Sequence, residues 1–209
     1  MPDSESRAKK VKLVLFDVDG VLTDGTLWFF PAPSAGTRAT DEQRAQHGDK
    51  PGFGILSQNM IEAKGFNAHD GTAISLARLG GLKTGMVTKR ISETVAIRAR
   101  DLRIDYLFQG ADNKSEVLDQ ILVQSGFRED EIAYVGDDVI DLPIMRRCGL
   151  AIAVANARPQ VKAMAHYETV SSGGDGAARD AVEYILQAQG TLDKVIDAYI
   201  ALRTSIKDQ

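Results

Sequence analysis

The stretch that decides the fold runs from Val11 to Gly25 and reads VKLVLFDVDGVLTDG. Its opening run, from Val11 to Phe16, is short and rich in Val and Leu, which is typical of a strand buried on both faces of a parallel sheet. The run stops at Asp17, where Asp-Val-Asp-Gly follows. This pattern predicts a central strand that delivers two carboxylates, Asp17 and Asp19, to the edge of a sheet.

Further along the chain, strand-like apolar runs alternate with segments of helical periodicity. Strands are predicted at 84–88, 106–109, 132–135 and 151–154, and helices at 71–82, 91–103, 114–124, 140–147, 158–165, 177–189 and 192–202. Strands that alternate with helices of ten to fifteen residues are typical of an α/β doubly wound parallel sheet. We expect one domain over residues 1–209, with a short frayed N-terminus.

Residues 31–58 break this alternation, because they mix Pro, Gly, Ser and charged residues without apolar periodicity. The flanking segments, 26–30 and 59–67, alternate apolar with polar residues and could pair as a β-hairpin. We therefore expect a β-hairpin flap over the active site or at an interface, with 31–58 as an inserted loop at its tip.

The composition narrows the class of protein. Hydrophobic residues make up 44% of the chain and charged residues 26%, as in a globular protein with a core. A formal net charge of -4 argues against a nucleic-acid or anionic membrane surface. No apolar stretch approaches the length of a membrane span, and the single cysteine, Cys148, cannot form an intramolecular disulfide. We expect a soluble cytoplasmic protein that binds neither nucleic acid nor membrane.

Polar side chains follow the predicted strands at four successive strand–helix junctions. In a parallel α/β sheet these positions converge on one crevice at the carboxyl ends of the strands. The set comprises Asp17 and Asp19, then Thr88, then Lys114, and finally Asp137 with Asp138 and Asp141.

Carboxylates clustered in a crevice repel one another, and they persist mainly where a cation neutralises them. Because the candidate ligands are all oxygens, Mg²⁺ fits better than zinc. Phosphoryl transfer needs an attacking oxygen, a cation and an acid for the leaving alkoxide, and this set offers a candidate for each. The residues therefore indicate Mg²⁺-dependent phosphoryl transfer.

Four segments, VLFDVDGVLTDG, MVTKR, the lysine of DNKSEV, and YVGDDVIDLPIM, resemble in order the four motifs of the haloacid dehalogenase superfamily. This resemblance implies a Rossmann-like fold and a phosphatase. It implies that Asp17 is the nucleophile and that Asp19 is the general acid and then the base. Thr88 would bind the phosphate, and Lys114 would hold Asp17 ionised.

The same resemblance implies the metal site. Mg²⁺ would lie between the Asp17 carboxylate, the Asp19 main-chain carbonyl and the Asp137 carboxylate. Asp138 and Asp141 would hold these ligands in place or reach the ion through water.

The likeness extends to the subfamily of small phosphatases that act on 3-deoxy-D-manno-octulosonate 8-phosphate, a sugar-acid phosphate. It rests on the segment from Asp17 to Gly25, on Asn67-x-x-Asp70-Gly71, on Gln109-Gly110, on 136–141 and on the tail 171–190. It implies a capless homotetramer in lipopolysaccharide biosynthesis, in which a neighbour's hairpin and tail close each active site.

The resemblance also suggests which residues contact the substrate, namely Asp70, Gly71, Arg90 and Arg98. Several positions depart from the subfamily pattern: Lys89 replaces the Gly of Thr-Gly-Arg, His69 replaces an Arg, Thr72-Ala73 replaces Tyr-Gly, and Ser75 replaces another Arg. These changes leave the chemistry intact and bear on the choice of substrate.

Other functions remain open. A related phosphatase for a nine-carbon keto-deoxy sugar acid 9-phosphate, or for another phosphometabolite, shares the same motifs. A non-catalytic oligomerisation module belongs to a different class, and the intact set of Asp17, Asp19, Thr88, Lys114 and Asp137 argues against it. A phosphomutase would need a long helical insertion, which the chain lacks.

Overall fold

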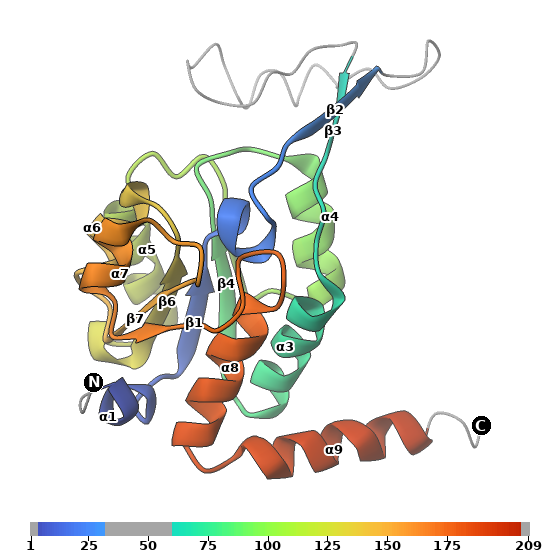
Figure 1. The fold of residues 1–209 in the computed structure, drawn as a ribbon. Helices are drawn as coiled ribbons and strands as arrows, with labels where there is room; N and C mark the ends of the chain where they lie inside the picture. Colours follow the sequence, from blue (N-terminus) through green and yellow to red (C-terminus); the bar gives the residue numbers. More distant parts are fainter. Residues whose placement is uncertain (1–3, 32–59, 206–209) are drawn as a thin grey trace.

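The computed structural model of the protein describes residues 4–31 and 60–205 and contains a six-stranded parallel sheet (Figure 1). Its strand order is β5-β4-β1-β6-β7-β8. The strands are β1 Leu13–Phe16, β4 Lys83–Val87, β5 Tyr106–Phe108, β6 Ile132–Gly136, β7 Leu150–Ala153 and β8 Tyr167–Glu168. The predicted α/β doubly wound sheet is confirmed.

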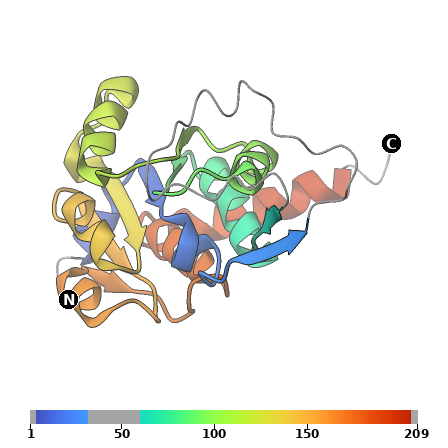
Figure 2. The same cartoon turned by 90° about the horizontal axis from the view of Figure 1, so that it is seen from above.

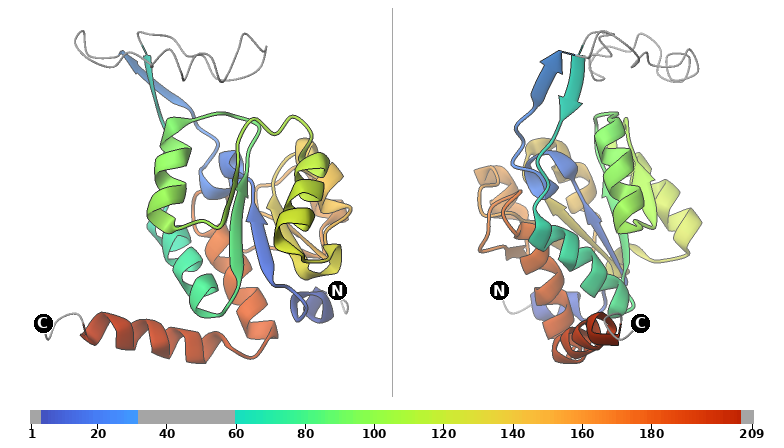
Figure 3. Two further views of the ribbon diagram at one scale, coloured as in Figure 1. Left: turned by 180° about the vertical axis from the view of Figure 1, so that it is seen from behind. Right: turned by 90° about the vertical axis from the view of Figure 1, so that its right-hand side faces the viewer.

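Helices cover both faces of the sheet (Figures 1 and 3). Helices α3 (Ala68–Leu79), α4 (Glu93–Leu102) and α8 (Ala177–Ala188) lie on one face, where α3 packs closely against α8. Helices α5 (Lys114–Ser125), α6 (Leu142–Met145) and α7 (Pro159–Met164) lie on the other. Helix α9 (Leu192–Ser205) packs against α3 and α8 at the amino ends of the strands.

Strand β1 occupies the centre of the sheet because its residues are apolar on both faces. It pairs with β4 and β6, with Phe16 opposite Met86 on one side and Val135 on the other. All four of its side chains are completely buried. The carboxyl ends of β1, β4 and β6 therefore lie side by side, at the edge that Figure 2 views from above.

A separate antiparallel hairpin stands above this edge (Figure 1). It is formed by β2 (Trp28–Pro31) and β3 (Met60–Ala63), with Trp28 opposite Ala63. The predicted hairpin is thus present, and the described residues form no further domain over this edge. The predicted inserted loop, 31–58, lies outside the described residues except for Pro31.

Two expectations from the sequence need correction, and one strand was not predicted. The N-terminus, expected to be frayed, forms helix α1 over Ser4–Ala8, and the Tyr184 hydroxyl donates a hydrogen bond to Ser4 in this helix (2.7 Å); residues 1–3 lie outside the described residues. The helix expected at 140–147 is a short 3₁₀ turn followed by α6. The short edge strand β8 was not predicted.

Among the helices in residues 4–31 and 60–205, none combines the length and the apolar character that a membrane span requires.

Candidate active site

The loop after β1 places Asp17 at the centre of the sheet edge. Its Oδ1 atom accepts a hydrogen bond from the Val18 amide (2.7 Å), which fixes the side chain at the start of the turn η1 (Val18–Leu22). Gly20 follows with a φ of +91°, and a Cβ atom there would overlap the Asp137 carboxylate. Glycine is therefore required to bring the β1 and β6 loops together.

Lys114 joins this centre from the first turn of α5, which Asn113 caps through its side chain (Asn113 Oδ1 to Ser115 N, 3.1 Å). The Lys114 Nζ atom lies 2.9 Å from Asp17 Oδ2 and 2.6 Å from Asp141 Oδ1. Its side chain is only 1% exposed. A buried ammonium of this kind is stable because two carboxylates surround it.

Tyr134 completes the cluster around Lys114. Its hydroxyl accepts a hydrogen bond from Lys114 Nζ (2.9 Å) and donates one to Asp141 Oδ1 (2.8 Å). Burial raises the pKa of Tyr134, so the hydroxyl keeps the proton that it donates. The sequence analysis missed Tyr134, because a tyrosine within a strand is usually a packing residue and nothing in its spacing marks it as a partner of Lys114.

Asp141 has both carboxylate oxygens occupied. Oδ1 accepts hydrogen bonds from the Lys114 ammonium and the Tyr134 hydroxyl. Oδ2 accepts hydrogen bonds from the amides of Asp137 (3.0 Å) and Asp138 (3.2 Å). Asp141 therefore holds the β6 loop against the lysine. The Asp138 carboxylate accepts a hydrogen bond from the Val139 amide (2.7 Å) and caps the turn η3 (Val139–Asp141).

The carboxylates at this edge have the electrostatics of a cation site. Burial raises the pKa of Asp17 to about 8, against the opposing effect of Lys114 and with a further rise from the charge of Asp141. Burial, Asp141 and Asp138 together raise the pKa of Asp137 to about 7. A cation bound beside Asp17 and Asp137 would lower both pKa values and favour the ionised carboxylates.

Three acidic side chains are close enough to share a metal ion. In the described part of the chain, one carboxylate oxygen from each of Asp17, Asp137 and Asp141 lies within 4.8 Å of the others. Because Asp141 is already fully hydrogen-bonded, Asp17 and Asp137 are the better candidates for direct ligands. An all-oxygen site of this charge fits Mg²⁺.

The Asp19 carboxylate lies in a more open position than Asp17, with 23% of its side chain exposed. Two cations flank it. Lys64 contacts Oδ1, and Arg90 Nε lies 3.7 Å from Oδ2. Thr88, at the end of β4, is 2% exposed, and its hydroxyl accepts a hydrogen bond from the Arg90 amide (3.2 Å). Lys64 was not identified from the sequence.

Gly71 and Arg98, both predicted to bind substrate, are neighbours. A Cβ atom on Gly71 would lie 2.6 Å from an Arg98 guanidinium nitrogen, so the glycine makes room for the arginine. The guanidinium carbon lies over the Phe66 ring, 5.5 Å from its centroid, within the range of a cation–π contact. Among the described residues, the Arg98 Nε–H has no hydrogen-bond partner.

Asp70 is placed differently. Its carboxylate is buried and accepts hydrogen bonds from the amides of Gly176 (3.3 Å) and Arg179 (3.1 Å), at the start of α8. It thus caps a helix more than a hundred residues away in the chain. Its predicted contact with substrate remains a prediction.

Comparison with known proteins decides the family. Residues 87–179 match the family pattern of haloacid dehalogenase-like hydrolases. The 3-deoxy-D-manno-octulosonate 8-phosphate phosphatase KdsC of Escherichia coli (strain K12) is 33% identical over 192 residues, which cover 92% of this chain and 88% of that protein. This chain belongs to the KdsC family of haloacid dehalogenase-like hydrolases.

Solved structures agree with this assignment to the KdsC family. The phosphatase of Moraxella catarrhalis, solved in complex with magnesium, phosphate and KDO, is 32% identical, with a TM-score of 0.78 over 95% of this chain and 99% of that one. A probable YrbI family phosphatase from Pseudomonas syringae pv. phaseolica is 38% identical, with a TM-score of 0.78 over 96% and 98%. The likeness therefore spans the whole fold.

Within this KdsC family fold, the structure brings together Asp17, Asp137, Asp141 and Lys114, with Asp19 and Arg90 beside them. Their roles in catalysis and metal binding remain predictions.

The tail after β8 also reaches this centre. A Cβ atom on Gly173 would overlap the carbonyl oxygen of Gly20, and the Gly174 amide donates a hydrogen bond to Val21 O (2.9 Å).

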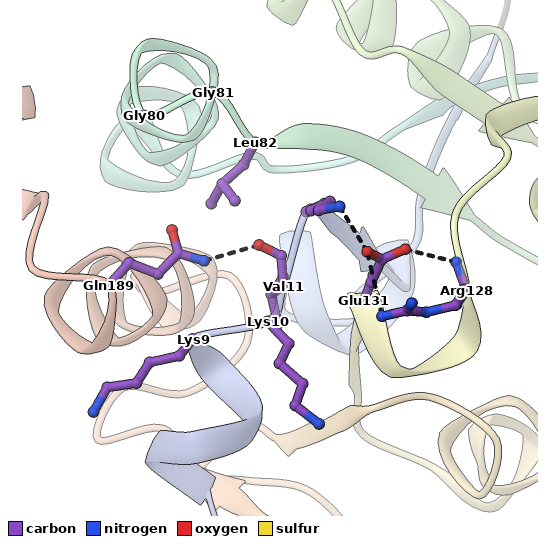
Figure 4. Close-up of a pocket in the computed structure, with 10 residues that line it drawn as sticks. Lys9, Lys10, Val11, Gly80, Gly81, Leu82, Arg128, Glu131 and Gln189 are labelled. Carbon is purple, nitrogen blue, oxygen red and sulfur yellow. Dashed lines mark hydrogen bonds and ion pairs between the residues drawn. The ribbon is translucent and has the colours of Figure 1, made fainter.

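A hollow of about 490 Å³ lies at the opposite end of the sheet (Figure 4). It is lined by residues that precede the strands and by basic side chains. In this hollow Lys12 forms an ion pair with Glu131 (2.6 Å), and the Arg128 amide donates a hydrogen bond to the same carboxylate (2.9 Å). The catalytic candidates line the other end of the strands, so this hollow is separate from them.

Proposed function

We propose that this chain is a Mg²⁺-dependent phosphomonoester hydrolase that acts on 3-deoxy-D-manno-octulosonate 8-phosphate through an aspartyl-phosphate on Asp17. The observation that carries the proposal is the buried contact between Asp17 and Lys114 at the carboxyl ends of the parallel strands. The carboxylate of Asp137 lies beside this pair, and the Asp19 carboxylate faces the more open side.

The first chemical step is attack by an Asp17 carboxylate oxygen on phosphorus. The bond from phosphorus to the sugar oxygen breaks, and Asp19 gives that oxygen a proton. Lys114 stabilises the ionised Asp17 before attack and neutralises phosphoryl charge afterwards. The Thr88 hydroxyl donates a hydrogen bond to a phosphoryl oxygen.

The second step regenerates the enzyme. Asp19, now ionised, takes a proton from water, and the water oxygen attacks the phosphorus of the aspartyl-phosphate. The acyl-phosphate bond breaks, and inorganic phosphate leaves with Asp17 restored. Asp19 is suited to both steps because its carboxylate is partly exposed while that of Asp17 is buried.

Mg²⁺ would be held by the Asp17 and Asp137 carboxylates and the Asp19 main-chain carbonyl. When bound, it supplies the positive charge that draws a phosphate dianion to a carboxylate cluster. The raised pKa values of Asp17 and Asp137 support this assignment, because a cation would return both groups to the ionised form.

The substrate assignment is supported by the likeness to KdsC proteins over nine-tenths of the chain. Arg98 is available for the sugar-acid carboxylate, because its planar guanidinium can bind a carboxylate through two nitrogens. We further propose that the enzyme works in the cytoplasm, in lipopolysaccharide biosynthesis, and that it is a homotetramer in which the β2–β3 hairpin contributes to subunit contacts.

A substrate panel tests this function. We expect kcat/KM for 3-deoxy-D-manno-octulosonate 8-phosphate to exceed that for the nine-carbon acid 9-phosphate and for glucose 6-phosphate. Equal turnover of glucose 6-phosphate would refute the sugar-acid assignment and leave the phosphatase standing. No turnover of any phosphate ester, p-nitrophenyl phosphate included, would favour the non-catalytic oligomerisation module.

A further inference from the structure

Lys64 comes directly after β3 in the chain. Figure 3 shows that the chain runs from the hairpin into the body of the protein after this strand. Its side chain has no solvent exposure. The ammonium group contacts Asp19 Oδ1 and lies 3.7 Å from Glu62 Oε1. A buried ammonium that has lost its water needs compensating negative charge. Asp19 provides it by direct contact, and Glu62 adds an ion pair that is too long for a hydrogen bond.

Glu62 is itself anchored to the start of α4. Its Oε1 atom accepts a hydrogen bond from the Ser92 hydroxyl (2.7 Å), and its main-chain carbonyl accepts one from the Thr94 hydroxyl (3.1 Å). The Glu62 carboxylate that pairs with Lys64 is therefore held in place. Lys64, paired with this anchored carboxylate and in contact with Asp19, restrains the Asp19 side chain.

Lys64 and Arg90 are not equivalent partners of Asp19. The Arg90 side chain is 36% exposed, and its Nε lies 3.7 Å from Oδ2, too far for a hydrogen bond. Lys64 is fully buried and contacts Oδ1 directly. Oδ1 of Asp19 is thus pinned, while Oδ2 is left without a close hydrogen bond from either cation.

We propose that Lys64 is the positioning residue for Asp19, which it holds with Oδ2 turned toward the leaving-group oxygen. The proposal rests on the phosphatase function proposed above. Without Lys64, the partly exposed Asp19 side chain would be free to occupy other rotamers. The β2–β3 hairpin thereby contributes to catalysis through the residue at its base.

Leaving-group dependence separates positioning from a general structural effect. For a phosphatase, kcat/KM reports the steps up to departure of the leaving group, and p-nitrophenolate needs no proton whereas a sugar alkoxide does. We expect Lys64→Met to lower kcat/KM for 3-deoxy-D-manno-octulosonate 8-phosphate by about 10- to 100-fold. For p-nitrophenyl phosphate the change should stay within about threefold, because no proton transfer is needed.

Lys83→Met is the matched control. It also removes a lysine that pairs with an aspartate, Asp105 at 2.7 Å, but at the amino end of β4, away from the site. We expect both substrates to be turned over as by the wild type. If Lys64→Met fails to fold, Lys64→Gln, which keeps an uncharged polar side chain, takes its place in the same comparison.

A double-mutant cycle tests whether Lys64 acts through Asp19. If it does, adding Lys64→Met to Asp19→Asn should change sugar-acid turnover by less than about threefold. An equal loss with both substrates in Lys64→Met, or additive losses in the cycle, would overturn the positioning role while leaving the phosphatase function intact. A wild-type protein with no phosphatase activity would overturn the proposed function and this inference together.

Discussion

The Lys114 ammonium lies 2.9 Å from Oδ2 of Asp17, and both side chains are buried. Asp17 comes from the loop after β1, while Lys114 opens α5, so the contact forms only when the sheet is assembled. The position of the Lys114 ammonium also depends on its other two partners, Tyr134 and Asp141, and these residues can be substituted without changing Asp17.

Tyr134→Phe removes one of those groups with little change of shape. The Lys114 ammonium would lose a hydrogen-bond acceptor, and Asp141 Oδ1 would lose a donor. We expect the free energy of unfolding to fall by about 1 to 2 kcal/mol and kcat to fall by about tenfold. Urea unfolding and steady-state kinetics check this. Tyr106→Phe on β5 is the control, and equal effects of the two variants would contradict the role of the Tyr134 hydroxyl.

Removal of Mg²⁺ should abolish turnover, since the carboxylates of Asp17 and Asp137 cannot accept a phosphate dianion without a compensating cation. Added Mg²⁺ should also stabilise the fold by about 2 to 3 kcal/mol at roughly 100-fold excess over its Kd. Asp137→Asn should reduce this stabilisation, whereas the exposed Asp112→Asn should not. Full activity after exhaustive chelation would rule out the metal requirement.

Arg98→Ala tests recognition of the sugar acid. The Arg98 Nε–H has no partner among the described residues, and Phe66 holds the guanidinium in place. We expect kcat/KM for the sugar-acid phosphate to fall on the order of 100-fold, and that for p-nitrophenyl phosphate to change little. Arg100→Ala, at an exposed position of the same helix, is the control. A similar loss with both substrates would show that Arg98 supports the fold instead.

The hairpin predicts the oligomeric state. The side chains of Trp28, Phe29 and Phe30 are 56%, 40% and 51% exposed. Exposure of three consecutive aromatic residues on an edge strand is unfavourable in water and favours burial against another subunit. We expect light scattering to show a homotetramer, and Phe30→Glu to dissociate it. Val123→Glu introduces the same charge at an exposed position of α5 and should leave the tetramer intact. A wild-type monomer at micromolar concentration would refute the proposed assembly.

The sequence was sufficient for five of the six strands of the sheet and for the residues at their carboxyl ends, because both follow from local patterns. The run from Leu13 to Phe16 is apolar at every position, as a strand covered on both faces must be. Asp17 directly follows β1, and Asp137 directly follows Gly136, the last residue of β6. Since parallel strands share one carboxyl edge, sequence position alone predicted that these groups meet.

The partners of these residues could not be read in the same way. Lys64 reaches the site from the residue after β3, and Tyr134 from within β6. No local pattern reveals that a lysine or a strand tyrosine will meet a carboxylate. Asp70, which the resemblance assigns to substrate, also caps α8 with its carboxylate, and no local pattern reveals that contact. Short elements such as α1 and β8 are stabilised by packing against the rest of the fold, so the intrinsic helix and strand propensities of their residues do not predict them.

The central claim is that Asp17 is the nucleophile, and trapping of the phosphorylated enzyme tests it most directly. Asp19→Asn, mixed with Mg²⁺ and excess p-nitrophenyl phosphate and quenched in acid, should accumulate the intermediate, because it retains the nucleophile but has lost the base for hydrolysis. We expect mass spectrometry to find one phosphoryl group, on the peptide that contains Asp17, and none after the further change Asp17→Asn. Phosphorylation at another residue, or undiminished turnover by Asp17→Asn alone, would contradict the mechanism.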